Sequence, residues 1–597
     1  MPIDEPGMID QPRLVIEHKN KAMIVFAIIL ALAYLYGVLS PQHYAPSVLD
    51  LYIGLGITLA LSVGLLIAIT QIKVNNMSYT TIICLFFAVL VALQPFLSPI
   101  DYSDSLLFPV AILLMMASLS LVIANIQDKS LIIKAIVASL YIGGILTVCT
   151  QLLQLLSLSY PAWLESLIFY GTDSSRPYGN VGQPNQAAYI ISMALVTAGY
   201  WYLSFKNQFQ TYSKLLVVML ACSIVFFGIG QGLSSSRGGL VLCIVACFSM
   251  VVLYQTSLKQ KLMFSGFFLA LWAAGNWIGT VLLLRYADFH QSALDRVIAI
   301  DSSRPLRWYL QEQAWLTFST DWITGAGWGN LPKVAWAHAE DLKRFEFATH
   351  THFLPSHIAA ELGLIGIVGL LGLGWIIIKG FIRSDHNIET KTLSILITLS
   401  LLYACSEYPF WYLRFLLLFT YLVALIDQKK IKFQFNIKPF LMAYFVILAV
   451  GSGFYIKNYR PYVAVDSLIK RDDVEAFEAQ ILVEQLNPIY GFSRFKDVMM
   501  FKVVSVNSNN IQSVIALGNI VIPNYLDPNL MNKQAKLLAL NSQSKESLRF
   551  YKAACLYNFL KYCNEVEHEL HLLSNSQPAV FASIYNDFKK WHTNREK

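Results

Sequence analysis

Residues 105–126 read SLLFPVAILLMMASLSLVIANI, a run without one charged side chain. A helix needs about 20 such residues to cross a bilayer. Similar apolar runs, some of them short, occur at 22–39, 49–70, 79–96, 105–126, 132–156, 186–204, 214–230, 239–255, 263–284, 358–378, 392–406, 411–426 and 439–456. Only 14% of the 597 residues are charged, whereas an ordinary soluble protein has about 25%. The sequence therefore predicts an all-α polytopic membrane protein with about 13 transmembrane helices, within a range of about 12–14.

Positive charge in short loops indicates which side of the membrane each loop occupies. With a cytoplasmic N-terminus, every loop assigned to the cytoplasm holds lysine: Lys73, Lys129/Lys134, Lys206/Lys214, Lys259/Lys261, Lys379/Arg383/Lys391 and Lys429/Lys430/Lys432/Lys438. The first two outer loops, 40–48 and 97–104, hold neither Lys nor Arg, and the later outer loops hold mainly Arg176, Arg237, Arg296, Arg304 and Arg307. These outer arginines are the exception that requires a function. The first apolar run follows basic residues without a clear cleavage site, which is typical of a retained signal anchor.

Two segments are too polar to cross a membrane, namely an external loop at 285–357 and the C-terminal stretch 458–597. In the latter, apolar residues recur at helical spacing in 468–486 and 548–573, and Pro488 and Pro528 interrupt the pattern. We therefore expect a transmembrane domain at 1–457, which includes the 285–357 loop, and a C-terminal module of packed helical hairpins at 458–597, outside the cytoplasm.

Cysteine usage gives little guidance to chemistry. Six of the eight cysteines lie in predicted spans, where they are expected to pack. Cys555 and Cys563 would lie about 12 Å apart on one helix, beyond disulfide reach, and would bond only if a turn intervened. No Cys/His cluster has the spacing of a zinc site, and no phosphate-binding glycine loop is present.

A polar stretch, Arg176-Pro177-Tyr178-Gly179-Asn180-Val181-Gly182-Gln183-Pro184-Asn185, lies between two apolar runs. A cation kept beside lipid is costly and usually serves a ligand. Gln183, Pro184 and Asn185 stand at the expected start of a helix, where free backbone N–H groups favour an anion. The alternative is that these residues only cap the helix and that Arg176 is a solvated loop charge.

Other arginines repeat this pattern on the outer side. Arg237, within Ser234-Ser235-Ser236-Arg237-Gly238-Gly239, offers a planar fork that matches phosphate oxygens, and the alternative is a plain tight turn. Arg304 and Arg307 precede an amphipathic stretch that is suited to the membrane surface. One of these two arginines is expected to face the site, and the other to contact lipid headgroups.

A histidine pair comes next, in Thr349-His350-Thr351-His352-Phe353. At an outer membrane interface an imidazole can take a proton from an incoming hydroxyl or position it. His357 and Glu361, one helical turn apart, could share a hydrogen bond. The alternative is that these histidines only pack at the interface.

The last candidate stretch, Ser406-Glu407-Tyr408-Pro409-Phe410, joins two predicted spans, and Arg414 follows inside the second. An acid and an arginine at this depth normally pair or face a polar cavity. A structural ion pair is the alternative to a functional role.

Taken together, these stretches resemble the Wzy/O-antigen ligase superfamily and, within it, bacterial protein O-oligosaccharyltransferases of the PglL type. The resemblance covers about 160–430 and rests on Arg176–Asn185, Ser235–Gly239, Arg307–Gly329, His350–His352 with Glu361–Gly366, and Ser406–Phe410. The loop from Arg-Pro-x-Gly to Gln-Pro-Asn favours protein glycosylation over lipopolysaccharide ligation. The family's second histidine is commonly followed by Asn, but here by Phe353, so the catalytic role falls on either His352 or His350.

The resemblance implies transfer of a preassembled glycan from undecaprenyl pyrophosphate to Ser or Thr of exported proteins, such as a pilin-like acceptor. The reaction would take place on the periplasmic side of a bacterial inner membrane, without metal or cofactor. Donor, acceptor protein and membrane lipid are the expected partners, and nucleic acid is not. The implied roles are acceptor activation by His352 or His350, pyrophosphate binding by Arg176, Arg237, Arg307 and Arg304, and positioning by Gln183, Asn185, Glu361, Glu407 and Tyr408.

Three alternatives remain open. An O-antigen ligase or a glycan polymerase would use the same donor with another acceptor. A metal-dependent oligosaccharyltransferase could use Asp101 and Asp104 of an early outer loop. A transporter of lipid-linked glycan would be expected to show internal repeats and charged or broken-helix features near the bilayer midplane.

Overall fold

The computed structural model describes residues 11–44, 50–156, 160–171, 176–208, 213–253, 257–287, 289, 291–298, 306–342, 348–385, 387–471, 474–557 and 561–596. Within them the regular secondary structure is almost entirely helical, and the chain is an all-α polytopic membrane protein, as predicted. The chain divides into two compact units. Unit 1 comprises Met1–Cys84, Leu114–Ile300 and Leu373–Lys457, and unit 2 comprises Leu85–Leu113, Asp301–Gly372 and Asn458–Lys597. The chain passes from unit 1 to unit 2 at the predicted domain boundary after Lys457, while the two-domain division itself stays a prediction.

The elements of unit 1 are α1 (Gln11–Leu39), α2 (Leu51–Gln71), β1 (Asn76–Ser78), α5 (Ser130–Leu156), α6 (Ala162–Glu165), η2 (Gly179–Val181), α7 (Pro184–Gln208), α8 (Ser213–Ser234), α9 (Arg237–Leu253), α10 (Leu258–Tyr286), α11 (Ala293–Ile298), α15 (Ile388–Ala404), η4 (Pro409–Trp411), α16 (Leu413–Ile426) and β2 (Lys430–Lys432). Those of unit 2 are η1 (Ser103–Leu106), α12 (Leu306–Thr320), α13 (Leu331–Ala337), α18 (Ala476–Glu484), α19 (Ser493–Val503), α20 (Ile511–Asn524), α21 (Pro528–Leu540), α22 (Ser544–Leu556), α23 (Cys563–Ser576) and α24 (Pro578–Glu596). Four helices contribute residues to both: α3 (Tyr79–Leu97), α4 (Leu107–Ala124), α14 (Leu354–Arg383) and α17 (Lys438–Ile469).

Within the described residues, ten helices are long and apolar enough to cross a membrane: α1, α2, α3, α4 with η1, α5, α7, α8, α10, α14 and α17. The predicted runs at 239–255, 392–406 and 411–426 coincide with α9, α15 and α16, which have 17, 17 and 14 residues. These three are shorter than the other ten. A total of thirteen spans therefore stays a prediction.

Loops that the charge pattern places on one side of the membrane come together in unit 1. At one end, β1 and β2 pair antiparallel, with Met77 opposite Ile431, and Ser130 donates to Glu389 at 3.3 Å. At the other end, a ring nitrogen of His43 lies 2.6 Å from the carbonyl oxygen of Asn180. Loops that are predicted to share a side of the membrane thus contact each other. The assignment of each end to cytoplasm or periplasm stays a prediction.

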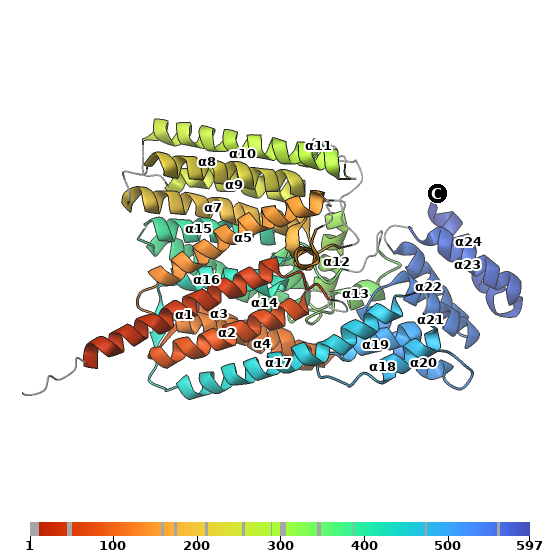
Figure 1. Ribbon diagram of the computed structural model, residues 1–597. Coiled ribbons are helices and arrows are strands. Elements are labelled where there is room, and N and C mark those ends of the chain that lie inside the picture. Colours follow the sequence, from red (N-terminus) through yellow and green to blue (C-terminus); the bar gives the residue numbers. More distant parts are fainter. Residues whose placement is uncertain are drawn as a thin grey trace, which may run out of the picture. The chain divides into compact units, whose positions relative to one another are not determined.

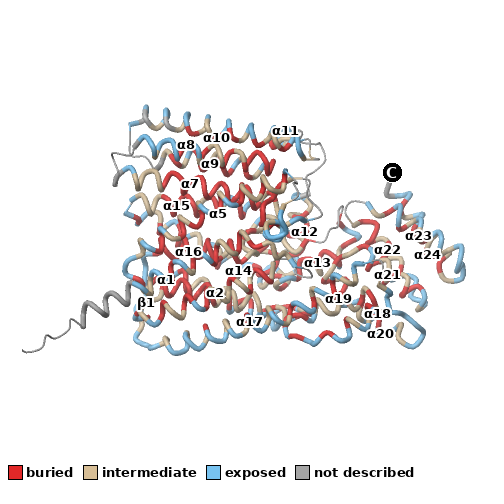
Figure 2. Tube along the Cα trace, viewed as in Figure 1, coloured by how far each residue is buried: buried red, intermediate tan, exposed pale blue. Residues whose placement is uncertain are grey.

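Helix α7 forms the interior of unit 1. Of its membrane-spanning window, 72% is buried, against 28% for α10, and Figure 2 shows this difference along the two helices. Small side chains on α7 let neighbours approach closely. A Cβ at Gly144 of α5, for example, would overlap the Cβ of Ala194. Figure 1 shows α5, α7, α8, α9 and α10 as neighbouring helices with roughly parallel axes.

Helices α8 and α10 pack backbone against backbone. Gly228 and Gly232 lie four residues apart on α8, and Gly275 and Gly279 do so on α10. A Cβ at Gly275 would overlap the carbonyl of Val225, and one at Gly279 or Gly232 would overlap backbone of the opposite helix. Such Gly-xxx-Gly pairs let membrane helices approach closely enough for dispersion to hold them. The contact fixes where the C-terminal ends of α8 and α10 lie.

The C-terminal residues of unit 2 form the predicted hairpins, α18 to α24, each helix packed on the next. Their apolar core also includes Ala335 and Trp336 of α13, so part of the long external loop belongs to this core. A turn separates α22 from α23, and Cys555 and Cys563 form a disulfide with their Cα atoms 4.1 Å apart. The possibility that both cysteines share one helix is therefore wrong, because the 548–573 pattern is broken between residues 556 and 563.

We expect Gly275→Val to lower the free energy of unfolding in detergent by about 1–3 kcal/mol, because the added side chain separates two backbones in contact. Gly266→Val is the matched control on the same helix, since a Cβ there meets no atom within 4 Å. Equal midpoints for the two variants in thermal unfolding would contradict this account of the packing.

Candidate functional site

The loop from Arg176 to Asn185 is held firmly in unit 1. The amide oxygen of Gln154 accepts hydrogen bonds from the N–H groups of Tyr178 and Gly179, at 3.0 and 2.8 Å. The amide of Asn180 donates to the carbonyls of Leu39 and Leu167, both at 2.6 Å. These side chains satisfy the backbone of a segment that has almost no regular structure.

Two glycines give this loop its path. Gly179 and Gly182 adopt φ values of 61° and 76°, the left-handed region in which a Cβ is unfavourable. A Cβ at Gly179 would also lie 3.0 Å from the hydroxyl of Thr150. The loop then leads into α7, whose first residue is Pro184, so the expected helix start at Gln183-Pro184-Asn185 is the one observed.

Three arginines from separate segments gather at the turn between α8 and α9. Arg176 donates to the carbonyls of Ser234 and Ser235 at 3.2 and 3.3 Å, and Arg296 donates to the same Ser235 carbonyl at 2.9 Å. Both guanidinium groups also stand over the ring of Phe289, at 5.3 and 5.9 Å from its centroid. The helix contact described above makes this possible, because it sets the α8 turn beside the segment that follows α10.

Arg237 completes the cluster at the first residue of α9. Ser235 takes a left-handed φ of 43°, which makes the turn tight, and exposed Arg237 donates to the backbone carbonyl of Arg296 at 3.2 Å. Burial and the charges of Arg296 and Arg237 lower the pKa of Arg176 to about 10. Burial and Arg237 likewise lower the pKa of Arg296. The positive end of the α9 dipole adds to this positive potential, and the cluster is suited to an anion.

A chain of hydrogen bonds joins Ser236, Asn185 and Glu407. The Ser236 hydroxyl donates to the Asn185 side chain at 2.8 Å, and the Asn185 amide donates to buried Glu407, also at 2.8 Å. Gln183 is close by and accepts from Gln186 at 2.9 Å. Of the predicted residues in unit 1, the structure thus places Asn185 and Glu407 in direct contact and connects them to the α8–α9 turn.

Arg414 pairs with Asp50 rather than with Glu407. Its guanidinium lies 2.9 Å from Asp50 and donates to Gln186 at 2.7 Å. His43 contacts the other Asp50 oxygen at 2.7 Å. Burial raises the pKa of Asp50, but the Arg414 charge and the bond to His43 together hold it below the ordinary value. Arg414 is 1% exposed, so the pair is a structural one inside the unit.

Sequence reasoning assigned no site role to Asp50, His43, Arg296 or Phe289. Arg296 had a usable signal, since it was among the outer arginines. Tyr408, which was predicted, stacks on Tyr412 with ring centroids 5.7 Å apart. Burial and neighbouring Tyr412 raise the pKa of Tyr408, so its hydroxyl stays protonated and able to donate.

The histidine pair lies in unit 2, just before α14. The rings of His350 and His352 are 5.1 Å apart, and His352 takes a left-handed φ of 56°, which is uncommon for this residue. Gln311 of α12 donates to the carbonyl of Thr351 at 2.9 Å and holds the segment between them. Burial, together with His352 and His357, lowers the pKa of His350 to about 2. His350 is therefore neutral at physiological pH and a weak base.

Helix α14 is interrupted at Gly363, which has φ 62°. The carbonyls of Ala360 and Glu361, freed by the interruption, accept from the N–H groups of Ala326 and Gly327 at 3.0 and 3.1 Å. No side chain fits at this contact, because a Cβ on Gly363 would overlap the Ile323 carbonyl. The glycine-rich turn after α12, Gly325–Asn330, is thus a backbone partner of the interrupted helix.

The remaining predicted residues of unit 2 have distinct surroundings. His357 lies 3.2 Å from Glu361, one turn on, and each side chain is 2% exposed. Arg307 is exposed on α12, and Arg304 lies outside the described residues. Trp308, Trp315 and Trp322 are exposed and seven residues apart, a spacing that suits a membrane-surface face.

Asp101 and Asp104, the aspartates of the metal-dependent alternative, both bind other residues of unit 2. Asp101 pairs with Lys333 at 2.9 Å and accepts from Asn524 at 2.8 Å. Asp104 accepts from the N–H of Gly491 at 2.8 Å and from Ser493 at 2.6 Å. Both carboxylates therefore have a structural use at the base of the C-terminal helices.

Comparison with known proteins gives one family. Residues 222–371 match the family model Wzy_C, described as O-antigen ligase. This match places residues 222–371 in the Wzy/O-antigen ligase superfamily. No curated protein shows significant sequence similarity to the chain.

The match to the O-antigen ligase family includes much of the geometry above. It contains the α8–α9 turn with Arg237, and also Arg296, Arg307, the histidine pair and Glu361. It supports an enzyme of the glycosyltransferase type that acts on a lipid-linked glycan, in a multi-pass membrane protein. The loop from Arg176 to Asn185 and the segment with Glu407 lie outside the matched residues.

We expect Asp50→Asn to destabilise the protein by about 3–5 kcal/mol, because it leaves the buried Arg414 without its counterion. Glu546→Gln is a suitable control, since Glu546 pairs with Arg549 at 3.7 Å and the two side chains are 51% and 39% exposed, and its loss should cost at most about 1 kcal/mol. Because the pKa of Asp50 is lowered, its contribution should persist above about pH 4 and be lost in stronger acid. Thermal unfolding across pH checks this: the same profile of midpoint against pH for Asp50→Asn and for the unmodified protein would contradict it.

Proposed function

We propose that the chain is a protein O-oligosaccharyltransferase, which moves a preassembled glycan from undecaprenyl pyrophosphate to Ser or Thr of exported proteins. The reaction would take place on the periplasmic side of a bacterial inner membrane. The convergence of Arg176, Arg237 and Arg296 on the α8–α9 turn carries the proposal. The superfamily membership and the loop from Arg176 to Asn185, similar to that of the PglL-type enzymes, give it further support.

The arginine cluster is suited to a pyrophosphate. Three cations in one place repel each other, and burial together with the charges of Arg296 and Arg237 lowers the pKa of Arg176. A bound pyrophosphate would relieve this repulsion and would gain charge as it leaves. Preorganised donors that face a developing charge stabilise the transition state most. The carbonyls of Ser234 and Ser235 and the ring of Phe289 hold two of these arginines in place beforehand.

In the proposed reaction, an acceptor hydroxyl attacks the anomeric carbon of the first sugar. The new C–O bond forms as the bond to the pyrophosphate oxygen breaks, and that oxygen keeps the electron pair. The hydroxyl proton passes to an imidazole. We assign this step to His352, since the low pKa of about 2 makes His350 a poor proton acceptor. Arg307 is proposed to bind the donor, while Gln183, Asn185, Glu407 and Tyr408 position groups in unit 1 and Glu361 in unit 2.

Two further features are consistent with this proposal. A disulfide such as Cys555–Cys563 is typical of proteins in an oxidising compartment, which agrees with a periplasmic C-terminal module. The carbonyls freed at the interruption of α14 already accept hydrogen bonds from the chain. These bonds give the carbonyls a structural use within the chain, whereas the broken helices of transporters use such carbonyls to coordinate ions.

The O-antigen ligase reaction is the second candidate, because the family that matches residues 222–371 bears that description. Donor and leaving group would be the same, and only the acceptor would differ. Reconstitution decides between the two. The assay combines purified enzyme and lipid-linked glycan with either an exported protein or a lipid A-core acceptor. The products are identified by intact mass spectrometry. Glycan mass added only to the lipid acceptor would refute protein transfer. Loss of activity with EDTA would refute a metal-free reaction.

His352→Asn should lower kcat by about 10²–10⁴-fold, because the acceptor hydroxyl loses its base. Asparagine tolerates the left-handed backbone at this position, so the fold should be kept. His350→Asn is the matched control and should reduce kcat far less. If transfer measured by intact mass survived both substitutions, the assigned base would be wrong.

Arg176→Lys should lower kcat by about 10²-fold, because lysine keeps the charge but loses the planar fork. Arg285→Lys is the control, an exposed arginine at the end of α10. Initial rates at saturating donor separate a change in kcat from a change in KM. An unchanged rate for Arg176→Lys would remove Arg176 from the pyrophosphate site.

A further inference from the structure

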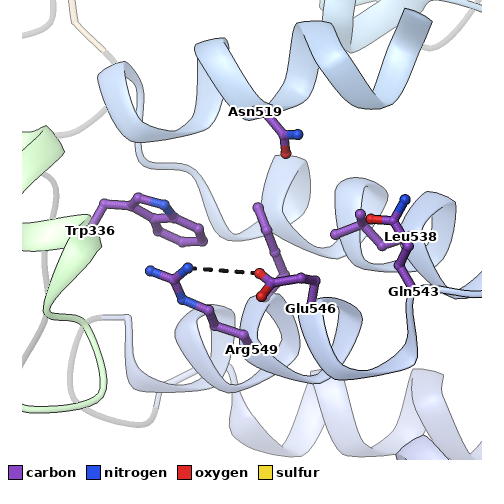
Figure 3. Close-up of a pocket in the computed structure, with 7 residues that line it drawn as sticks. Trp336, Asn519, Leu538, Gln543, Glu546 and Arg549 are labelled. Atoms are coloured by element: carbon purple, nitrogen blue, oxygen red, sulfur yellow. Dashed lines mark ion pairs between the residues drawn. The ribbon is translucent and has the colours of Figure 1, made fainter. Parts of the chain in front are cut away.

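Unit 2 contains a cavity of about 340 Å³, and none of the proposed site residues lines it. It lies between α13, α20, α21 and α22, and Figure 3 shows its lining. Trp336, Leu538 and Phe550 supply an apolar wall and are themselves largely buried, at 7%, 2% and 5% exposed. Small-molecule sites usually measure about 300–1,000 Å³, so the cavity suits a compact ligand.

Four polar side chains surround this wall: Asn519, Gln543, Glu546 and Arg549. Each ends in a planar group with two polar atoms side by side. Glu546 and Arg549 form an ion pair at 3.7 Å, with side chains 51% and 39% exposed. Such a long, exposed pair contributes about 0–1 kcal/mol, so both groups can turn to a ligand at little cost.

Other contacts preorganise the lining. The Asn519 side-chain oxygen accepts from Gln534 at 2.9 Å, which fixes the plane of its amide. The Trp336 ring packs on Phe550 with centroids 4.6 Å apart, and the Arg549 guanidinium stands 5.6 Å from the indole. In Figure 3 the indole and the guanidinium lie next to each other, and Asn519 points toward them from the opposite helix.

We propose that this cavity binds a neutral sugar of the glycan that the enzyme transfers. The neighbouring hydroxyls of a pyranose ring match the paired atoms of amide, carboxylate and guanidinium groups, and its C–H groups can lie against the apolar wall. One Arg and one Glu leave no net charge in the lining, so a pyrophosphate is disfavoured. The proposal rests on the proposed glycan transfer, which supplies the sugar, and names a place where the glycan is recognised.

The test measures binding of the donor's own oligosaccharide, released from its lipid by mild acid, to the full-length protein in detergent, by calorimetry. The double variant Asn519→Ala/Gln543→Ala removes two exposed amides and should weaken binding roughly tenfold. Gln512→Ala, an exposed amide on α20 outside the cavity, should bind as the unmodified protein does. Inorganic pyrophosphate should not displace the oligosaccharide. Unfolding midpoints confirm that each variant is folded.

Two outcomes would overturn the proposal. One is equal oligosaccharide binding by the double variant and by Gln512→Ala. The other is that the double variant loses binding of a Ser/Thr-rich acceptor peptide and not of the oligosaccharide. A parallel transfer assay keeps the two proposals separate. Protein glycosylation with unaltered sugar binding in the double variant leaves the proposed function standing and removes the sugar site. If sugar binding depends on the cavity but glycan is transferred only to a lipid acceptor, the sugar site stands and the proposed protein transfer is removed.

Discussion

The backbone contact between α8 and α10 is the constraint on which the cationic end of unit 1 depends. Glycines on both helices remove the Cβ atoms that would otherwise separate them. Because both helices end on the same side, the Ser235 turn then lies beside the segment after α10. Ser235 can donate to the Gln291 carbonyl at 2.9 Å while its own carbonyl accepts from Arg296. With an ordinary side-chain layer between the helices, these short bonds could not form.

The arginine cluster stores unfavourable electrostatic energy in the free protein. Arg176 and Arg296 are partly buried and face like charges, and the pKa of each is lowered as a result. Carbonyl dipoles and the Phe289 ring offset part of this cost. A bound anion would reduce it further. The same feature that destabilises the free cluster therefore favours a doubly charged ligand such as the proposed pyrophosphate.

Much of the fold could be predicted because the length and polarity of a segment are local properties. The apolar runs, the helix start at Pro184 and the parity of the loops follow from such properties. Pairings between distant segments do not. Glu407 was the nearest acid in sequence to Arg414, yet Asp50 is its partner, because the choice depends on how α1, α2 and α16 pack. The α8–α10 contact was recognisable, since Gly-xxx-Gly in two apolar runs has a known packing meaning.

The interruption of α14 shows how one glycine connects two predicted motifs. Backbone groups at membrane depth must find partners within the protein. The carbonyls of Ala360 and Glu361 find them in the turn after α12, so the Gly-rich turn and the Glu361–Gly366 stretch form one substructure. Gln311 of α12 holds the carbonyl of Thr351, between the two histidines. The histidine pair is therefore anchored from α12 on one side and by α14 on the other, which keeps His352 in a backbone conformation it would rarely adopt alone.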